Sequence, residues 1–329
     1  MNRLWICNDV WMDIFPSFDH AQLGLKLALL SPRFNALVDK HFNGKSELTI
    51  WRPIEIRRKD KGPGPKLFVL FNDKFVPFPL PDRPLPSKIR FKCLQMWYID
   101  HSVIAFLRSN HQIFDKRGTY LHLRIQSPHT TEEQPIWDVF VREIWPIFSV
   151  NIRHLDFYDA ADLDNLRLRT SPTILTDLNQ LVTIDSCDLL PDSIGADFDA
   201  TISAGQALSK WLHSPRKDGQ PKRLQGNFDW VNNFKEQFLR ANAISSVTYE
   251  IHFYVHVPSI QIVPFELVNE LTKEKLTLAK TKGWDNRWIM KRCKIGETAA
   301  VQQKKKVENW GNSCNNVFIW LFSDTHCIG

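Results

Sequence analysis

The stretch ICNDVWMDIFPSFDHAQLGLKLALLSPRFNALVDKHF, from Ile6 to Phe42, decides the fold that we expect at the start of the chain. Its capping and breaking residues predict three short helices. Asn8 can cap the first helix, which Pro16 ends, and Asp19 can cap a second, leucine-rich helix. The Ser31-Pro32 pair opens the third, because Ser is favoured at a helix cap and Pro at the first helical position.

The leucines of the second predicted helix fall on two opposite sides. At about 100° per residue, Leu23, Leu27 and Leu30 form one stripe, and Leu25 and Leu29 lie almost opposite. One stripe can face the other two helices, but the second needs a further partner. Since a bundle of about forty residues seldom stabilises itself, its cover must come from the rest of the chain or from another protein.

The apolar residues outside the Leu23, Leu27 and Leu30 stripe divide into a core and a partner face. We assign Val10 and Ile14 chiefly to the core of the bundle. Met12, Leu25 and Leu29 are the better candidates for contact with a partner, because they lie off the main stripes.

Several positions of this stretch follow a recognisable order: Ile6, Asp9-Val10, Ile14-Phe15, Leu23, the run from Leu27 to Ser31, and Arg33-Phe34. This order resembles the F-box, a motif that docks a Skp-type adaptor of a cullin ubiquitin ligase. Cys7 departs from it, because the motif usually has Pro after its first hydrophobic residue.

The resemblance implies adaptor-binding residues in this stretch, and a plain helical bundle buried in the body of the protein is the alternative. With the partner-face candidates included, the expected adaptor contacts are Ile6, Met12, Phe15, Leu23, Leu25, Leu29, Leu30 and Phe34.

Composition bounds the class of protein. The chain has 329 residues, of which 43% are hydrophobic, enough for a sizeable core and more than one domain. The net charge is +6, and the 42 Lys and Arg residues are interspersed with 36 acidic residues rather than gathered in one place. The charge therefore indicates no particular partner. The six cysteines lie far apart without a CxxC pair, as is typical of reduced intracellular thiols. With no secretory signal or 18-residue apolar run, we expect a cytoplasmic or nuclear protein.

The chain divides into four expected parts, which together predict an α+β or α/β fold. Residues 1–45 form the F-box-like three-helix domain, and residues 46–88 a short β segment with a Pro-rich connector. Residues 89–243 form an irregular α/β repeat-like domain, and residues 244–329 a β-rich region.

Strands and helices alternate in the third part about every 30 residues, with fragments similar to leucine-rich repeats. We expect an irregular leucine-rich-repeat-like solenoid, and an ordinary α/β sheet is the alternative. The expected strands are Ile89–Cys93, Tyr120–Ile125, Ile152–Phe157, Leu181–Ile184 and Leu224–Phe228.

The last part is rich in strand patterns, such as those in residues 245–257, 274–280, 287–295 and 317–324, with a charged helix expected over Thr298–Trp310. Segments 207–224, 264–278 and 287–295 resemble a large nematode-expanded family of F-box proteins. The similarity then covers nearly the whole chain, and it implies that the body selects partners.

Patterns for catalysis and cofactors are weak. Gly44-Lys45-Ser46 lacks the rest of a phosphate-binding loop, and His252 and His256 lie too far apart on a strand to share a zinc ion. The acids from Asp156 to Asp164 follow a predicted strand and are typical of a solvated turn. We therefore expect no catalytic residue, cofactor or metal, and no nucleic-acid or membrane partner.

These observations predict a non-catalytic, substrate-recruiting subunit of a Skp-cullin-F-box ubiquitin ligase. Its partners would be a Skp-type adaptor, through it a cullin, and an unidentified target protein. Two alternatives stay open: a protein-binding scaffold with no link to ubiquitin, and an enzyme whose site is assembled from distant residues.

Overall fold

The computed structural model describes residues 6–43, 48–58, 64–71, 74–86, 89–111, 118–126, 133–158, 160–186, 189, 191, 203–226, 231–242, 248–255, 262–281, 286–296 and 315–322. These residues form a mixed α/β fold, which confirms the expected class. Several predictions fall outside them: the charged helix over 298–310, the segment Gly44 to Ser46, and His256.

The amino-terminal stretch forms helices close to those predicted. Asp19 caps the second helix, and its side chain and that of Gln22 each accept a hydrogen bond from the other's backbone N–H. The first helix has Cys7, not Asn8, at its cap position, so that prediction is one residue off. The segments are α1 (Asn8–Ile14), a 3-10 turn (Phe15–Ser17), α2 (His20–Gln22), a π-helical turn (Leu23–Leu27), α3 (Ala28–Leu30) and α4 (Pro32–Asn43).

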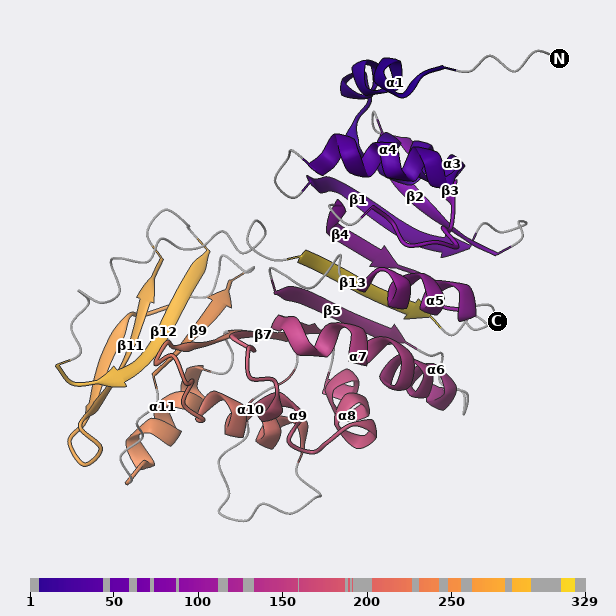
Figure 1. Cartoon of the computed structure of the whole chain (residues 1–329). Coiled ribbons are helices and arrows are strands. Elements are labelled where there is room, and N and C mark those ends of the chain that lie inside the picture. Colours follow the sequence, from indigo (N-terminus) through magenta and orange to yellow (C-terminus); the bar gives the residue numbers. More distant parts are fainter. Residues whose placement is uncertain are drawn as a thin grey trace. The chain divides into compact units, whose positions relative to one another are not determined.

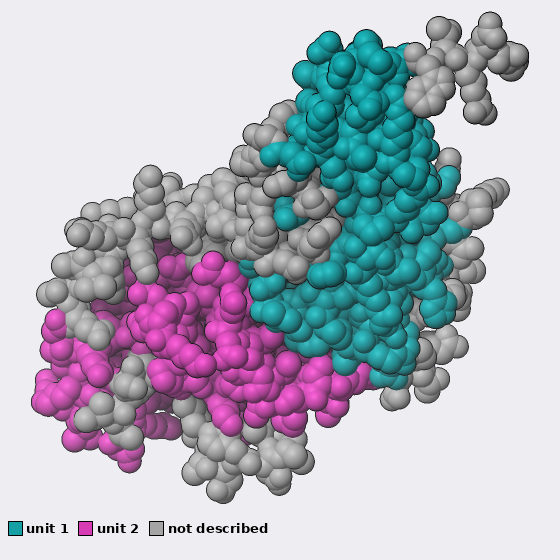
Figure 2. Space-filling model, in the orientation of Figure 1, with its two compact units in different colours: residues 1–121, 125–151, 313–329 teal, residues 122–124, 152–312 magenta. Residues whose placement is uncertain are grey.

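The chain divides into two compact units, which Figure 2 distinguishes by colour. Unit 1 comprises residues 1–121, 125–151 and 313–329, and unit 2 comprises residues 122–124 and 152–312. These bounds differ from the four consecutive parts expected from local composition, because distant segments pair with one another.

Unit 1 contains a mixed group of strands. β1 (Leu48–Arg58) pairs antiparallel with β2 (Pro65–Phe71), which pairs with β3 (Lys74–Pro79). On its other side β1 runs parallel to β4 (Ile89–Met96), and β4 runs parallel to β13 (Asn315–Phe322).

The carboxyl-terminal strand β13 therefore belongs to unit 1 rather than to a carboxyl-terminal layer. It lies between β4 and β5 (Thr119–Gln126), as Figure 1 shows. The expected succession of neighbouring repeats from β4 to β5 is wrong at this point. The helices of unit 1 beyond the amino-terminal group are α5 (His101–Ser109), α6 (Glu133–Val139), a π-helical turn (Phe140–Ile144) and α7 (Trp145–Phe148).

Unit 2 contains the regular part of the α/β pattern. Four strands run parallel in chain order: β6 (Ile152–Phe157), β7 (Thr183–Ser186), β8 (Lys222–Gly226) and β9 (Tyr249–Tyr254). The helices between them are α8 (Ala160–Arg169), α9 (Ile174–Asp177), α10 (Ala204–Leu212) and α11 (Val231–Arg240), and Figure 1 shows them along one side of the strands.

Three antiparallel strands extend unit 2 beyond β9. They follow the order β12 (Arg287–Lys294), β11 (Glu274–Lys280) and β10 (Phe265–Asn269). Alternation of buried and exposed residues along β11 and β12 matches a sheet with one covered face. Within the described residues, the strands of the chain are ordered as a 13-stranded mixed sheet.

One helix contradicts the sequence reading. The acids after β6 were expected in a solvated turn, but α8 contains Asp162 and Asp164, and Asp162 is only 3% exposed. None of the helices in the described segments is long and apolar enough to cross a bilayer.

Candidate functional site

The amino-terminal helices have their own buried core. α4 packs against α1, the π-helical turn and α3, and β1 lies against α2. The buried apolar side chains in this stretch are Phe15, Ala21, Leu23, Leu25, Ala28, Leu37, Val38 and Phe42. Much of the second apolar side of the leucine-rich helix is therefore covered by the chain itself.

A π-helical turn alters the side of the helix on which each leucine lies. It spans Leu23–Leu27, and a π turn bonds each N–H to a carbonyl five residues away, so it rotates the following residues relative to an α-helix. Leu23 and Leu25, predicted on opposite sides, are both buried, with exposed fractions of 0% and 1%. The assignment of Leu25 to a partner face is wrong.

Three aliphatic side chains near the start of the chain remain exposed, and we call them the apolar ledge: Ile6, Val10 and Leu30. Their exposed fractions are 40%, 44% and 61%. The prediction that Val10 and Ile14 belong chiefly to the core is wrong for Val10, and Ile14 is only half-buried, because α1 buries none of its residues. Each methylene of the ledge that a partner removes from water would add favourable free energy.

Hydrogen bonds from Arg33 keep the segment of Ile6 close to that of Leu30. Its Nη2 donates to the carbonyl oxygen of Ile6 at 2.8 Å and to Oδ1 of Asn8 at 2.7 Å, and its Nε donates to the same Asn8 oxygen at 3.1 Å. Since Arg33 follows Leu30 by three residues, these bonds place the beginning of α1 beside the α3–α4 corner. The sequence pattern includes Arg33 among the F-box-like positions but does not predict these hydrogen bonds.

The other predicted contact residues fall into two groups. Phe15 and Leu23 are buried in the core, so they support the surface but do not form it. Met12, Leu29 and Phe34 are half-buried, and the ring of Phe34 lies edge-on to Trp11 with centroids 5.0 Å apart. The structure thus brings Ile6, Met12, Leu29, Leu30 and Phe34 to the surface in whole or in part.

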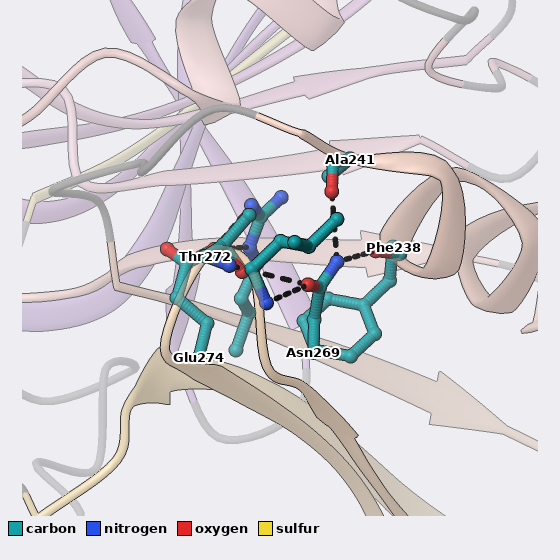
Figure 3. A network of polar contacts seen from close by, with 7 residues as sticks. Phe238, Ala241, Asn269, Thr272 and Glu274 are labelled. Carbon is teal, nitrogen blue, oxygen red and sulfur yellow. Dashed lines mark hydrogen bonds and ion pairs between the residues drawn. The ribbon is translucent and has the colours of Figure 1, made fainter.

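Unit 2 contains a contrasting polar network that is buried (Figure 3). Nδ2 of Asn269 donates to the carbonyl oxygens of Phe238 and Ala241 at 2.8 and 2.9 Å, which ties β10 to the end of α11. Oδ1 of Asn269 accepts from the backbone N–H groups of Leu271 and Thr272. The side-chain amide thereby uses both donors and both acceptor positions within the chain.

An ion pair lies beside this network. Nη2 of Arg292 on β12 donates to Oε2 of Glu274 on β11 at 2.6 Å, and Glu274 is 0% exposed. The ring of Phe238 lies 5.6 Å from the guanidinium carbon of Arg292. No sequence signal marked this pair, because it depends on the register of β11 and β12.

A small hollow of about 190 Å³ occurs in unit 1 between α5 and the π-helical turn Phe140–Ile144. Its charged lining residues already contact one another, since Glu143 accepts hydrogen bonds from both Arg108 and Arg142. These contacts lower the pKa of the Glu143 carboxyl, first through the hydrogen bond from Arg142. Across the described segments, no cluster of three or more His, Cys, Asp or Glu residues has the geometry to hold a metal ion.

Comparison with known proteins gives no relative. No family model, no curated protein and no solved structure matches this chain.

Proposed function

We propose that this chain is a non-catalytic, substrate-recruiting subunit of a Skp-cullin-F-box ubiquitin ligase. Its amino-terminal helices bind a Skp-type adaptor, which connects the chain to a cullin, and its body holds a target protein. Because the partners belong to the cytoplasm or nucleus, the proposal places the chain there too.

The apolar ledge is the observation that carries this proposal. Ile6, Val10 and Leu30 are motif positions, and they are exposed beside a group of helices with a buried core of its own. Exposed aliphatic side chains held by a fixed contact, here Arg33, favour a protein interface over a plain structural bundle. An interface of standard size would bury roughly 1,600 Å² in total, and the ledge would form part of its centre.

The mechanism is a gain in effective concentration. A target held on the body and an adaptor held on the helices become parts of one assembly, so transfer of ubiquitin no longer depends on a chance encounter. The bond-making chemistry belongs to other subunits of the ligase, and the chain contributes binding and positioning.

Titration of the full-length chain with a purified Skp-type adaptor tests the proposal. Leu30→Asp places a charge on the ledge and is expected to weaken binding at least about tenfold. Leu168→Asp is the matched control, because Leu168 is 81% exposed on α8 in unit 2, and it should bind as the parent chain does. Equal binding by the two variants would remove the ledge from the interface, and no binding by the parent chain would favour the ubiquitin-independent scaffold.

A further inference from the structure

The parallel strands of unit 2 carry polar side chains on one face. Alternate residues on the other face, such as Leu155, Ile184 and Leu224, are 0% exposed. The strand register aligns the residues between them in two rows. One row is His154, Thr183, Arg223, Glu250 and Lys291, and the other is Asp156, Asp185, Gln225 and His252.

One end of this polar face is neutralised within the chain. Glu250 lies 2.8 Å from the Lys291 ammonium, 3.4 Å from Nε of Arg223 and 3.5 Å from Nε2 of His252. Burial alone would raise the pKa of Glu250, but the contacts with His252, Lys291 and Arg223 lower it to about 2. This acid is ionised, and two positive groups, Lys291 and Arg223, lie within 3.4 Å of it.

The other end has two acids on adjacent strands, Asp156 and Asp185, of which Asp156 has a histidine partner. Asp185 on β7 is aligned with Asp156 on β6 and with the neutral Gln225 on β8. Asp156 contacts Nδ1 of His122 on β5 at 2.7 Å. Burial, and then the charge of Asp156, raises the pKa of Asp185 to about 8. No cation among the described residues contacts Asp185, in contrast to Glu250.

A buried hydroxyl lies beside these acids. Thr183 precedes Asp185 by two residues, so the two side chains share a face of β7, and Thr183 is only 7% exposed. Its Oγ1 has no hydrogen-bond partner among the described atoms. Its neighbour in the register, His154, is held neutral, because burial lowers the pKa of the ring to about 4. The site therefore offers oxygen acceptors. The other neighbour of Thr183 in the register, Arg223, lies 3.4 Å from Glu250.

We propose that Asp156, Asp185 and the Thr183 hydroxyl bind an arginine side chain of a recruited protein. Aligned residues on neighbouring strands are roughly 5 Å apart, and a guanidinium presents donors on more than one edge, so it can reach both carboxylates at once. A bound guanidinium supplies the positive charge that Lys291 and Arg223 supply to Glu250. In assigning this arginine to a target protein the inference rests on the proposed function, although the binding itself needs no adaptor.

The test uses the full-length chain without adaptor and two small probes. Nα-acetyl-arginine-N-methylamide carries the guanidinium, and the matching citrulline derivative is its neutral isostere. Binding is followed by NMR shifts of the Asp185 side-chain carboxyl carbon. We expect the arginine probe to bind at least tenfold more tightly than the citrulline probe. We also expect its affinity to increase as the pH is raised from 6 to 9, because Asp185 must be ionised.

Three variants complete the experiment. Asp185→Asn and Asp156→Asn should each weaken binding of the arginine probe at least tenfold, measured by the shifts of backbone amides in β6 and β7. Asp82→Asn is the control, because that side chain is 93% exposed in unit 1, and it should change nothing. Equal binding of the two probes, or parental affinity in Asp185→Asn, would overturn the site. Since Asp185→Asn should keep normal adaptor binding, failure here is distinguishable from failure of the adaptor role.

Discussion

The polar network around Asn269 and the apolar ledge at the amino-terminal helices differ in how their side chains are satisfied. Asn269 and Arg292 make their hydrogen bonds inside unit 2, and Glu274 has no exposed surface. Leu30 and Val10 contact water over about half of their surface, without a covering element among the described residues. The difference indicates that the first region contributes to folding stability and that the second is available for binding.

The largest expected effect comes from breaking the buried ion pair. Arg292→Met leaves the Glu274 carboxylate without its partner, and this should lower the free energy of unfolding by about 4 kcal/mol. Urea denaturation measures the loss. Arg240→Met is the control, because Arg240 is 82% exposed and its pair with Glu236 should contribute less than about 1 kcal/mol. Similar losses in both variants would contradict the stabilising role of this pair.

Loss of the Asn269 amide should have the next largest effect. Asn269→Ala leaves the carbonyl oxygens of Phe238 and Ala241 and the N–H of Thr272 without this partner, which should cost about 3 kcal/mol. Leu271→Ala in the same turn should change stability by less than about 0.5 kcal/mol, because Leu271 is 73% exposed. Thermal unfolding followed by circular dichroism compares the two, and equal melting temperatures would argue against the network.

Asp185 and Glu250 should give opposite pH dependences. The raised pKa of Asp185, about 8, means that the folded state retains a proton that the unfolded state loses, so its contribution to stability falls as the pH rises from about 4 to 8. The lowered pKa of Glu250, about 2, has the opposite sign, so its contribution is present above about pH 4.5 and is lost as the pH falls toward 2.

Denaturation at a series of pH values tests the pH dependences expected for Asp185 and Glu250. Asp185→Asn should flatten the fall in stability between pH 5 and 8, by up to about 1.4 kcal/mol for each pH unit. Glu250→Gln should instead destabilise the protein at neutral pH, because two positive groups, Lys291 and Arg223, then lose their counter-charge. A parental pH profile in Asp185→Asn would show that its carboxyl titrates normally.

The smallest stability effect is expected on the ledge. Leu30→Asp should change the free energy of unfolding by less than about 0.5 kcal/mol, since the side chain is 61% exposed. Leu23→Ala in the same stretch should lower the free energy of unfolding by about 2 kcal/mol or more, because Leu23 is fully buried. Chemical denaturation of both variants distinguishes surface from core, and a large loss in Leu30→Asp would place Leu30 in the fold rather than in an interface.

Local sequence signals predicted much of the secondary structure. The cap at Asp19, the start of α4 at Pro32 and the full extent of β6 were all expected from capping and alternation. Each of these features depends on residues within one turn or one strand. Physical rules about neighbouring residues therefore suffice for them.

The misassigned features depend on residues far apart or on helix geometry. The pairing of β13 with β4 joins positions more than 200 residues apart, and no local pattern indicates it. The burial of Leu25 follows from the π-helical turn, which the ideal angle of about 100° per residue does not anticipate. The acids Asp156 and Asp185 were not expected to lie together, because they come from separate strands.

Hydrogen exchange of the full-length chain, with and without a purified Skp-type adaptor, tests the central claim most directly. The proposed function predicts that the adaptor slows amide exchange in residues 6–43 and leaves the β10–β11 hairpin of unit 2 unchanged. Slowed exchange confined to unit 2, or no change anywhere in residues 6–43, would contradict it.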